Sequence, residues 1–552
     1  MLDGFVPWPK EFVEKYKQKG CWQGVTLGEV FDNFVSRYSD RLALVGDNTR
    51  VTYKELGQKV DRLAYGMVEL GFKTGDRIVV QLPNILELVY LYFACQKIGV
   101  IPIMSLAAHR WAEISYFAEL AEARGYAAPA RLGKFDYQAM ARELRQKVSS
   151  VQFILIAGQT DQADMISIND TITKEINLEK SRTVIASHRP DPMEPAVMQL
   201  SGGTTGIPKL IPHPHNDYYH KSRHCVEVTN LDQNTVLLVV IPLAHDFPLA
   251  DPGLTGTLMS GGRVVLSNSV QSEDIFRLIE QEGVTVMPCS PTFLYRWLDA
   301  PERKQHNLSS LKCLWVGASK PEADVLKKIM KEFSCDIQQV YGMSEGVVCY
   351  MRTDDPLELK LTTQGRPICP EDEFKIIGDD GKVVPKGEVG EFCARGPSII
   401  RGYYKAPERN KEAFTSDGFY RSGDLVKLHE SGNLIIVGRT KDLINRGGEH
   451  ISAEEVERHS VLHPKVVNAA CVGMSDRVLG ERTCIFVTVK KAETLTLDEL
   501  NEFLLNERRI AKYKLPERLE ILEDLPLSNI GKVEKKVLRE TINRKLKEEG
   551  VI

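Results

Sequence analysis

The stretch Met198-Gln-Leu-Ser-Gly-Gly-Thr-Thr-Gly-Ile-Pro-Lys-Leu210 carries the strongest structural signal in the chain. The apolar residues Ala196–Leu200 predict a strand that runs into a loop of small and hydroxyl-bearing residues ending at Lys209. Glycines let backbone N–H groups converge, hydroxyls add donors and the lysine adds positive charge, so the loop is predicted to wrap a polyphosphate. It is not a Walker A loop, because Pro208 separates the lysine from the glycines and no Ser or Thr follows. The candidate phosphate-binding residues are Ser201, Gly202, Gly203, Thr204, Thr205 and Lys209.

Composition excludes several classes of function. The 552 residues are enough for more than one domain, and the net charge of −4 leaves no basic footprint for nucleic acid. No apolar run is long enough to span a bilayer, and the start of the chain lacks a secretory signal. The 11 cysteines are scattered without a Cys-x-x-Cys pair and indicate reduced thiols that fill the core. We therefore expect a cytoplasmic protein without a nucleic-acid or membrane partner.

Alternating helical and strand patterns predict an α/β fold over the first two-thirds of the chain. A helix capped by Ser272 and running to Gln281 precedes strands at Val284–Pro288 and Leu311–Val316, and Arg77–Leu82 predicts another buried strand. Such repeats predict layered parallel sheets, which bind ligands at the carboxyl ends of their strands. The residues expected at those ends are Ser201, Ala318, Tyr341 and Gly342.

The pattern changes from about Asp372. Short alternating strands separated by Gly and Asp turns predict a small β-barrel-like subdomain, and a polar, glycine-bearing link near Lys441 predicts the main boundary. We expect a core domain of residues 1–440, with two α/β layered subdomains, and a small mobile α+β domain of residues 441–552. Within the second, Val533–Leu546 predicts an amphipathic helix with Val533, Val537 and Leu546 on its apolar side.

Four motifs together resemble the adenylate-forming (ANL) superfamily of ligases, over essentially the whole chain. The similarity is greatest to stand-alone aryl acid adenylating enzymes such as 2,3-dihydroxybenzoate–AMP ligase. The motifs are Gly4-Phe-Val-Pro-Trp-Pro with Gly20-Cys-Trp22, Leu200-Ser-Gly-Gly-Thr-Thr-Gly, Gln339-Val-Tyr-Gly-Met-Ser-Glu-Gly346 and Asn445-Arg-Gly-Gly-Glu449.

The resemblance implies a two-step reaction that uses ATP and Mg²⁺. A carboxylate attacks the α-phosphate to give an acyl-adenylate and pyrophosphate, and a thiol then displaces AMP after the C-terminal domain has rotated. The thiol belongs to the phosphopantetheine of a carrier protein or to CoA. Two anions must meet in the first step, so positive charge has to offset their repulsion.

The same resemblance implies roles for individual residues. Glu345 suits a Mg²⁺ ligand, because Mg²⁺ prefers oxygen, and Ser344 is expected at the α-phosphate. Tyr341 resembles the aromatic residue that stacks on adenine, with Gly317 and Ala318 at its other face. Asp424 and Arg439 resemble the ribose-binding pair.

The C-terminal domain carries a second set of expected residues. Lys532 resembles the lysine that bridges the substrate carboxylate and the α-phosphate in the first step only, a task that suits a point charge on a long stem. Lys441 matches the hinge position. His450 stands where related enzymes commonly have Lys, so its role in the second step is open. The catalytic candidates are Lys532, His245 and Glu345.

Substrate choice is expected in His245-Asp-Phe-Pro-Leu-Ala-Asp-Pro-Gly253. The aryl-acid branch usually has Asn where this chain has Asp246, and Ser where it has Asp251. A buried carboxylate accepts hydrogen bonds and needs a cation or strong donor. We therefore hypothesise an amino-bearing acid such as anthranilate or 3-hydroxyanthranilate. Phe247 is expected as an apolar wall, and Val340, Val347 and Val348 as the pocket floor.

Other substrates and functions remain open. If Asp246 is protonated or pairs with a donor of the protein, the enzyme takes 2,3-dihydroxybenzoate or salicylate. A β-amino acid is a further substrate class, and an acyl-CoA synthetase would share the first step. A non-catalytic nucleotide-binding sensor would be favoured by loss of Lys532, Asp424 or Glu345, but all three are present.

Overall fold

The structure is a computed structural model of the 552-residue chain. It describes residues 1–160, 162–201, 208–318, 321, 323–378, 380–439, 443–491, 493–526, 533 and 535–552, and at positions 292, 438, 439, 443, 450 and 454 it describes the backbone only. Below, the core means the described residues up to 439 and the C-terminal domain those from 443.

Two large sheets form the framework of the core. Within the described residues, the first has nine strands in the order β18-β17-β16-β15-β14-β12-β13-β1-β2, and the second has seven in the order β11-β10-β4-β3-β5-β8-β9. The first sheet contains β18 (Arg366–Pro367), β17 (Val348–Tyr350), β16 (Asp336–Gly342), β15 (Cys313–Val316), β14 (Val286–Cys289), β12 (Val236–Val239), β13 (Arg263–Leu266), β1 (Leu42–Gly46) and β2 (Thr49–Thr52). The second contains β11 (Lys209–Pro214), β10 (Pro195–Ser201), β4 (Ile101–Met104), β3 (Arg77–Val80), β5 (Gly125–Pro129), β8 (Phe153–Ala157) and β9 (Ile166–Ser167).

Alternating side chains on these strands build a five-layer core. In β3, Ile78 and Val80 face the core shared by both sheets, whereas Val79 faces the opposite side. The shared core contains α2 (Leu27–Arg37), α3 (Tyr53–Leu70), α4 (Leu86–Ile98), α9 (His215–Thr229) and α11 (Gly253–Met259). The outer face of the first sheet is covered by α12 (Ser272–Glu282), α13 (Pro291–Asp299) and α14 (Ala323–Phe333), and that of the second by α5 (Trp111–Leu120) and α6 (Tyr137–Lys147).

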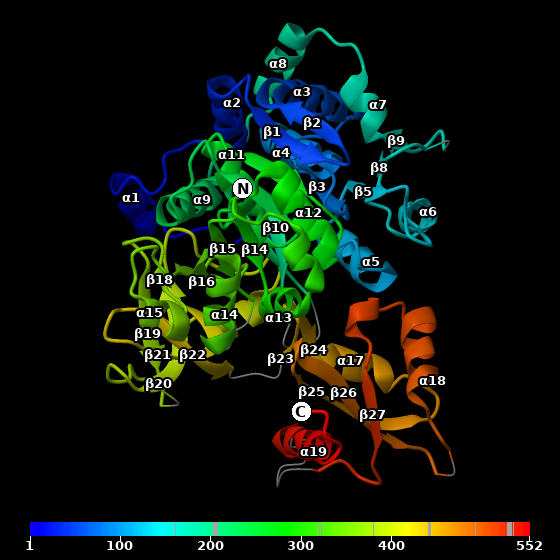
Figure 1. The fold of residues 1–552 in the computed structure, drawn as a ribbon. Coiled ribbons are helices and arrows are strands. Elements are labelled where there is room, and N and C mark those ends of the chain that lie inside the picture. The colour runs from blue at the N-terminus through cyan, green and yellow to red at the C-terminus, as the bar shows by residue number, and fades with distance from the viewer. Residues whose placement is uncertain are drawn as a thin grey trace.

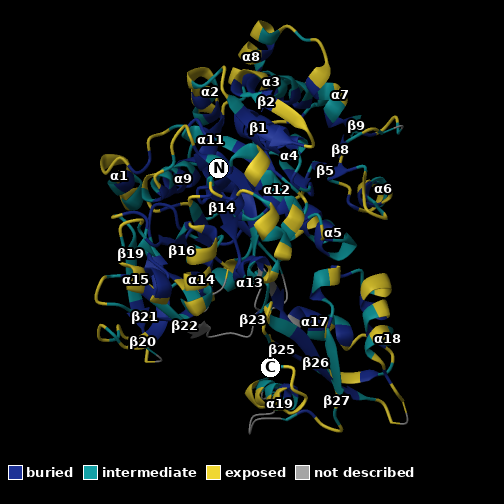
Figure 2. Ribbon diagram, in the orientation of Figure 1, coloured by how far each residue is buried: buried dark blue, intermediate teal, exposed yellow. Residues whose placement is uncertain are grey.

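Helix composition follows this layering. Of the 13 residues in α4, 12 are buried, as expected for a helix that is apolar on all sides. By contrast, α12 buries Ile275, Phe276 and Ile279 and exposes its charged side, so its outer surface is yellow in Figure 2. The first residue of α12 is Ser272 and its cap position is Gln271, one residue before the cap expected from the sequence.

A small antiparallel sheet and the C-terminal domain complete the fold (Figure 1). The small sheet contains β19 (Glu373–Ile377), β20 (Val389–Arg395), β21 (Tyr420–Leu428) and β22 (Leu434–Arg439). The C-terminal sheet contains β23 (Leu443–Arg446), β24 (Glu449–Ser452), β25 (Val466–Asp476), β26 (Gly480–Val489) and β27 (Arg518–Ile521), with helices α17 (Ala453–Ser460), α18 (Leu497–Glu502) and α19 (Lys535–Glu548). The fold class predicted from the sequence is confirmed.

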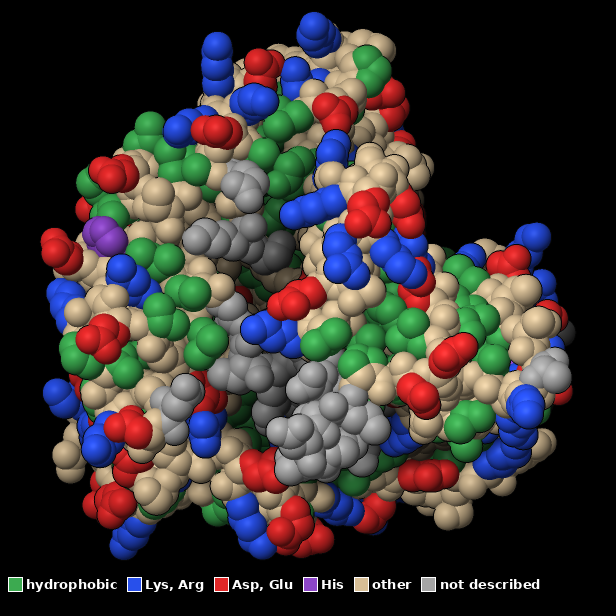
Figure 3. All heavy atoms as spheres, turned by 90° about the horizontal axis from the view of Figure 1, so that it is seen from below, with side chains coloured by type: hydrophobic (Ala, Val, Ile, Leu, Met, Phe, Trp, Pro, Cys, Tyr) green, Lys and Arg blue, Asp and Glu red, His purple; other side chains and the backbone are tan. Residues whose placement is uncertain are grey.

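Further helices and short strands are α1 (Lys10–Gln18), α7 (Ile168–Thr173), α8 (Leu178–Ala186), α10 (Asp246–Ala250), α15 (Leu357–Thr362), α16 (Pro407–Ala413), β6 (Arg131–Leu132) and β7 (Phe135–Asp136). Of these, α10 is largely buried. Lysine and arginine side chains are interspersed with aspartate and glutamate on the face shown in Figure 3. Among the described helices, none combines the length and apolarity that crossing a membrane requires.

The apolar side of α19 differs from the sequence prediction. Leu538, Ile542 and Leu546 pack against β25 and β26, whereas Val537 is 40% exposed. The helix begins at Lys535, and its i, i+4, i+8 positions meet the sheet from Leu538 onward. The prediction was right for Leu546 and wrong for Val537.

Exchanging these neighbours for alanine tests the packing of α19. Leu538→Ala should lower the free energy of local opening by about 2–5 kcal/mol, because it leaves a cavity under the helix. Val537→Ala, the matched control one residue away, should change it by less than about 0.5 kcal/mol. Native-state amide exchange in β25 and β26 measures both, and equal effects would contradict the assignment.

Candidate functional site

A cavity of about 1510 Å³ lies where strand ends of both large sheets meet the small sheet and the C-terminal domain. Most site residues expected from the sequence line it, although their positions range from 201 to 424. They are Ser201, Lys209, His245, Asp246, Phe247, Asp251, Gly317, Ala318, Val340, Tyr341, Gly342, Ser344, Glu345, Val348 and Asp424. The carboxyl-end rule for parallel sheets predicted Ser201, Ala318, Tyr341 and Gly342, and the family resemblance predicted the others.

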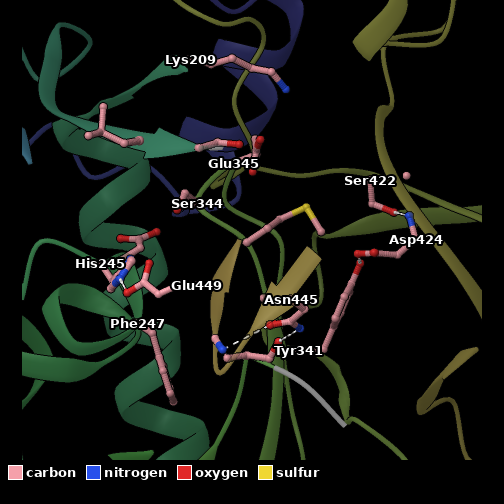
Figure 4. Close-up of a pocket in the computed structure, with 18 of the residues that line it drawn as sticks. Lys209, His245, Phe247, Tyr341, Ser344, Glu345, Ser422, Asp424, Asn445 and Glu449 are labelled. Carbon is pink, nitrogen blue, oxygen red and sulfur yellow. Dashed lines mark hydrogen bonds and ion pairs between the residues drawn. The ribbon is translucent and has the colours of Figure 1, made fainter. Parts of the chain in front are cut away.

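Tyr341 and Asp424 form one side of the cavity (Figure 4). The Tyr341 hydroxyl donates a hydrogen bond of 2.8 Å to Asp424 Oδ2, which joins the end of β16 to β21. Burial and the neighbouring Asp424 carboxylate raise the pKa of Tyr341 well above its ordinary value, so the phenol stays protonated. Asp424 pairs with Arg439 in the register of β21 and β22. An aromatic ring and a buried carboxylate thus lie together, as expected for a nucleoside site.

A cation and a carboxylate meet at a tyrosine on another side. Lys209, at the start of β11, donates a 3.4 Å hydrogen bond to the Tyr403 hydroxyl, which donates a 2.7 Å bond to Glu345 Oε1. The Lys209 ammonium also lies 4.4 Å from the centre of the Tyr403 ring. Ser344 lies beside Glu345, and its carbonyl oxygen is 2.6 Å from His213 Nε2. This side of the cavity combines the positive charge of Lys209 with oxygen atoms that can bind a metal ion.

The C-terminal domain contributes the β23–β24 hairpin to the cavity. The Asn445 side chain donates a 2.9 Å hydrogen bond to the carbonyl of Ala318, a residue in the left-handed region at φ 72°. At Gly448, φ is 100° and an added Cβ would lie 3.2 Å from Ala318 Cβ, so glycine allows this close approach. Glu449 Oε1 lies 3.4 Å from His245 Nε2 across the domain boundary. Figure 4 shows these two side chains facing each other.

A buried lysine holds the two domains together beside the cavity. The Lys514 ammonium lies 3.2 Å from Glu113 of α5 and 2.8 Å from Glu455 of α17. Burial raises the pKa of Glu113, but Lys514, His109 and backbone hydrogen bonds together hold it below its usual value. Arg509 adds a bidentate pair to Glu143 of α6, with both distances 3.0 Å. Charge pairing thus fixes this placement of the C-terminal domain.

Asp246 has partners within the protein, which corrects a premise of the sequence analysis. Lys221 of α9 is fully buried, and its ammonium forms an ion pair with Asp246 Oδ2. The Tyr218 hydroxyl donates a 2.5 Å hydrogen bond to Asp246 Oδ1. The carboxylate therefore does not require a substrate cation for charge balance, because Lys221 provides one.

Asp251 shares the same lysine but keeps accepting capacity. Lys221 Nζ lies 3.0 Å from Asp251 Oδ1, yet no donor among the described residues meets this oxygen with hydrogen-bond geometry. Burial and the nearby Asp246 raise the pKa of Asp251 to about 7, against the opposing effect of Lys221. One ammonium between two carboxylates leaves a surplus of negative charge and of acceptors at this end of the cavity.

The apolar lining follows the sequence prediction with one exception. Phe247, Val340 and Val348 line the cavity, but Val347 does not. Val347 packs into the core of the small antiparallel sheet. Neighbouring residues of an extended segment point to opposite sides, so Val347 and Val348 cannot share a face.

Several expected residues lie outside the described part of the chain. These are Gly202, Gly203, Thr204, Thr205, Lys441 and Lys532, together with the side chains of Arg439 and His450. Their roles remain predictions.

Sequence reasoning missed Lys221, Tyr218, Tyr403 and Glu449. For Lys221 a faint signal existed, because α9 carries polar residues on all sides, which is unusual for a helix among apolar neighbours. Its burial between two aspartates depends on the tertiary fold and could not be seen in the sequence.

The fold and cavity define a nucleotide-binding enzyme whose small domain covers the site. The family model described as "AMP-binding enzyme" matches residues 31–404, and that of the "AMP-binding enzyme C-terminal domain" matches residues 455–532. The chain belongs to the AMP-binding enzyme family.

Relatives match over nearly the whole chain. A 2,3-dihydroxybenzoate-AMP ligase of Bacillus subtilis is 44% identical over 99% of both chains. A salicylyl-CoA synthase / salicylate adenylyltransferase of a Streptomyces species is 43% identical over 98% of both. The solved apo structure of MbtA from Mycobacterium smegmatis has a TM-score of 0.73 and 35% identity, covering 97% of this chain and 98% of that one.

The His245–Glu449 pair predicts a pH-dependent domain contact. Burial lowers the pKa of His245, but Glu449, with a smaller effect of Asp246, raises it above its ordinary value. The pair's contribution is therefore fully present below the ordinary pKa and is lost as pH rises through the raised value. In Glu449→Gln, the His245 pKa measured by NMR titration should fall; an unchanged pKa would contradict the contact.

Removing the Lys221 ammonium should show how far the two buried aspartates lower the free energy of unfolding when no cation balances them. Lys221→Met leaves them unbalanced and should lower the free energy of unfolding by about 3–5 kcal/mol. The loss should grow as pH rises, because both carboxylates can protonate at low pH. Adding Asp246→Asn and Asp251→Ser removes the charges and should restore most of the stability in urea unfolding. No recovery in the triple variant would argue against the charge explanation.

Proposed function

We propose that the protein activates an aryl carboxylic acid with ATP, releases pyrophosphate and transfers the acyl group to a thiol. The observation that carries this proposal is one cavity holding a Tyr341–Asp424 pair, a Lys209–Tyr403–Glu345 group and a buried aspartate pair. These suit a nucleoside, phosphates and a small ring. The names of the relatives agree, since they describe acid–AMP ligases and adenylyltransferases.

Each group has a distinct task in the first step. Tyr341 would stack on adenine, and Asp424 would accept hydrogen bonds from the ribose hydroxyls. Lys209 would reduce the repulsion between the attacking carboxylate and the phosphates. Glu345 would hold Mg²⁺, for which a carboxylate beside phosphate oxygens is a fitting ligand set. The bound Mg²⁺ would supply charge neutralisation at the phosphates.

The aspartate pair favours hydrogen-bond donors on the ring of the acid. Asp246 and Asp251 are acceptors when ionised, whereas an Asn or Ser could also donate. A benzoate with a 2-hydroxyl has one proton there, and its own carboxylate competes for it. A 2-amino group has two, so one N–H can bond the substrate carboxylate while the other bonds Asp246. We therefore propose a 2-amino acid such as anthranilate, or 3-hydroxyanthranilate with its hydroxyl directed to Asp251. Because Lys221 and Tyr218 already pair with Asp246, 2,3-dihydroxybenzoate or salicylate is the second candidate.

We propose a thiol acceptor for the second step, and we propose that the arrangement with the β23–β24 hairpin against Ala318 serves that step. A carrier-protein phosphopantetheine is the proposed acceptor, as in natural-product or siderophore synthesis. CoA is the alternative, because one relative is named a CoA synthase. Thioester formation with each thiol separates the two.

An ATP–pyrophosphate exchange panel tests the acid. 3-Hydroxyanthranilate should exceed 2,3-dihydroxybenzoate in kcat/KM by about tenfold, the effect of one hydrogen bond to a charged group. Salicylate, anthranilate, benzoate and a β-amino acid complete the panel. Asp246→Asn, which leaves Lys221 paired with Asp251, should move the preference toward hydroxybenzoates. A strong wild-type preference for 2,3-dihydroxybenzoate would refute the amine proposal, and silence toward every acid would refute adenylation.

Lys532→Ala tests the division between the half-reactions. Adenylation should fall by at least about 100-fold, because the bridging charge is lost from the first transition state. Thioester formation from supplied acyl-adenylate should remain within about twofold. Lys536→Ala is a matched control, since Lys536 is an exposed lysine of the same region. Equal loss in both half-reactions would contradict the assignment.

A further inference from the structure

A cluster of histidine and cysteine side chains lies on α9, outside the cavity. His220 and His224 are one helical turn apart, and Cys369 comes from the loop between β18 and β19. One ligand atom from each lies within 4.8 Å of those from the other two. His220 Nε2 is 3.2 Å from Cys369 Sγ, and the two imidazole centres are 4.5 Å apart. Residues almost 150 positions apart are thus brought to one point.

A second cysteine adjoins the first. The side chain of Cys21 adjoins that of Cys369, although Cys21 is not among the three residues whose ligand atoms lie within 4.8 Å of one another. Cys21 follows α1, and Arg223 of α9 bonds the carbonyl of Gly20, so this segment lies against α9 (Figure 1). The cluster therefore offers two sulfurs and two imidazole nitrogens.

We propose that His220, His224 and Cys369 form a Zn²⁺ site that is completed by the adjoining Cys21 and ties α9 to the β18–β19 loop and the N-terminal segment. Two thiolates and two imidazoles are the donor set that tetrahedral zinc prefers. Zinc–ligand bonds of about 2.3 Å to sulfur and 2.0–2.1 Å to nitrogen place the two donors about 3.6 Å apart in a tetrahedron. The separation of His220 Nε2 and Cys369 Sγ is close to this value.

The surroundings of the ligands support the assignment. Glu227 Oε2 lies 2.8 Å from His224 Nδ1, which orients the ring and leaves Nε2 for a metal. The Glu371 backbone N–H donates to Cys369 Sγ at 3.4 Å, a contact that stabilises a thiolate. His220 is fully buried, and its Nδ1 has no hydrogen-bond partner among the described residues.

Charge balance explains why zinc suits this interior. Each cysteine thiol releases its proton to solvent as its Zn–S bond forms, and the two histidines bind as neutral rings. Two thiolates then neutralise the divalent ion, so the buried group carries no net charge. Cys21, Cys369 and His220 are 3%, 4% and 0% exposed, and the His224 side chain, at 16%, leaves the most accessible side for entry.

Metal analysis of untagged, full-length protein tests the proposal. After chelator dialysis under reducing conditions, one Zn²⁺ should bind per chain and raise the melting temperature. One Co²⁺ should give a thiolate-to-metal charge-transfer band and intense tetrahedral visible bands. These readouts do not depend on ligase activity, so failure here leaves the proposed function standing.

Matched variants identify the ligands. Cys369→Ser and His224→Gln should abolish the tight Zn²⁺ stoichiometry, and Glu227→Gln should weaken binding by about 10–100-fold. Cys21→Ser should remove part of the charge-transfer intensity. Cys335→Ser, a buried cysteine outside the cluster, is the control and should bind as wild type. The Zn²⁺ stoichiometry of the wild type is measured without any substitution, and His224 is partly exposed. These two measurements therefore test the site even if a substitution in the core prevents folding.

Three outcomes would overturn the site. The first is wild-type protein that retains no Zn²⁺ above the level of Cys369→Ser. The second is a Co²⁺ complex without a thiolate band. The third is a disulfide between Cys21 and Cys369, found by mass spectrometry of protein purified without reductant, with no metal bound after reduction.

Discussion

Lys221 places an ammonium group between two buried carboxylates, and the acid-binding end of the cavity depends on this ion pair. A lysine without exposed surface is stable only where negative charge surrounds it, and the aspartates are equally dependent on the lysine. A change at Lys221 therefore affects both aspartates, whereas a change at one aspartate leaves the lysine paired with the other.

Charge also determines how the two domains meet. Lys514 lies between a carboxylate of α5 and one of α17, and His245 lies opposite Glu449. Rotation of the C-terminal domain would have to break both contacts and return their groups to water. Each contact is polar and joins specific residues, so charge pairing determines which placement of the domain is stabilised.

Much of the fold followed from local patterns in the sequence, and the site followed from a rule about strand ends. The strand at Pro195–Ser201 and the helix at Ser272–Glu282 have strong periodicity, and the structure places them within a residue or two of the prediction. Val347 and Val537 were assigned to the wrong faces. Periodicity gives the relative directions of side chains, but it does not say which of those directions faces the core. The partners of Asp246 could not be predicted from the sequence. Lys221 lies 25 positions earlier, on a helix whose polar sequence resembles that of a solvent-exposed helix.

The helix α9 contributes side chains to two separate sites. His220 points to the thiols near the N-terminal segment, and the next residue, Lys221, points to the acid pocket. Successive residues of a helix differ by about 100° in direction, so neighbours in sequence can serve opposite sides. Transfer of this helix into a related ligase, to alter its choice of acid, would also transfer the histidines that face Cys369. The residues at positions 21 and 369 would then have to be transferred as well.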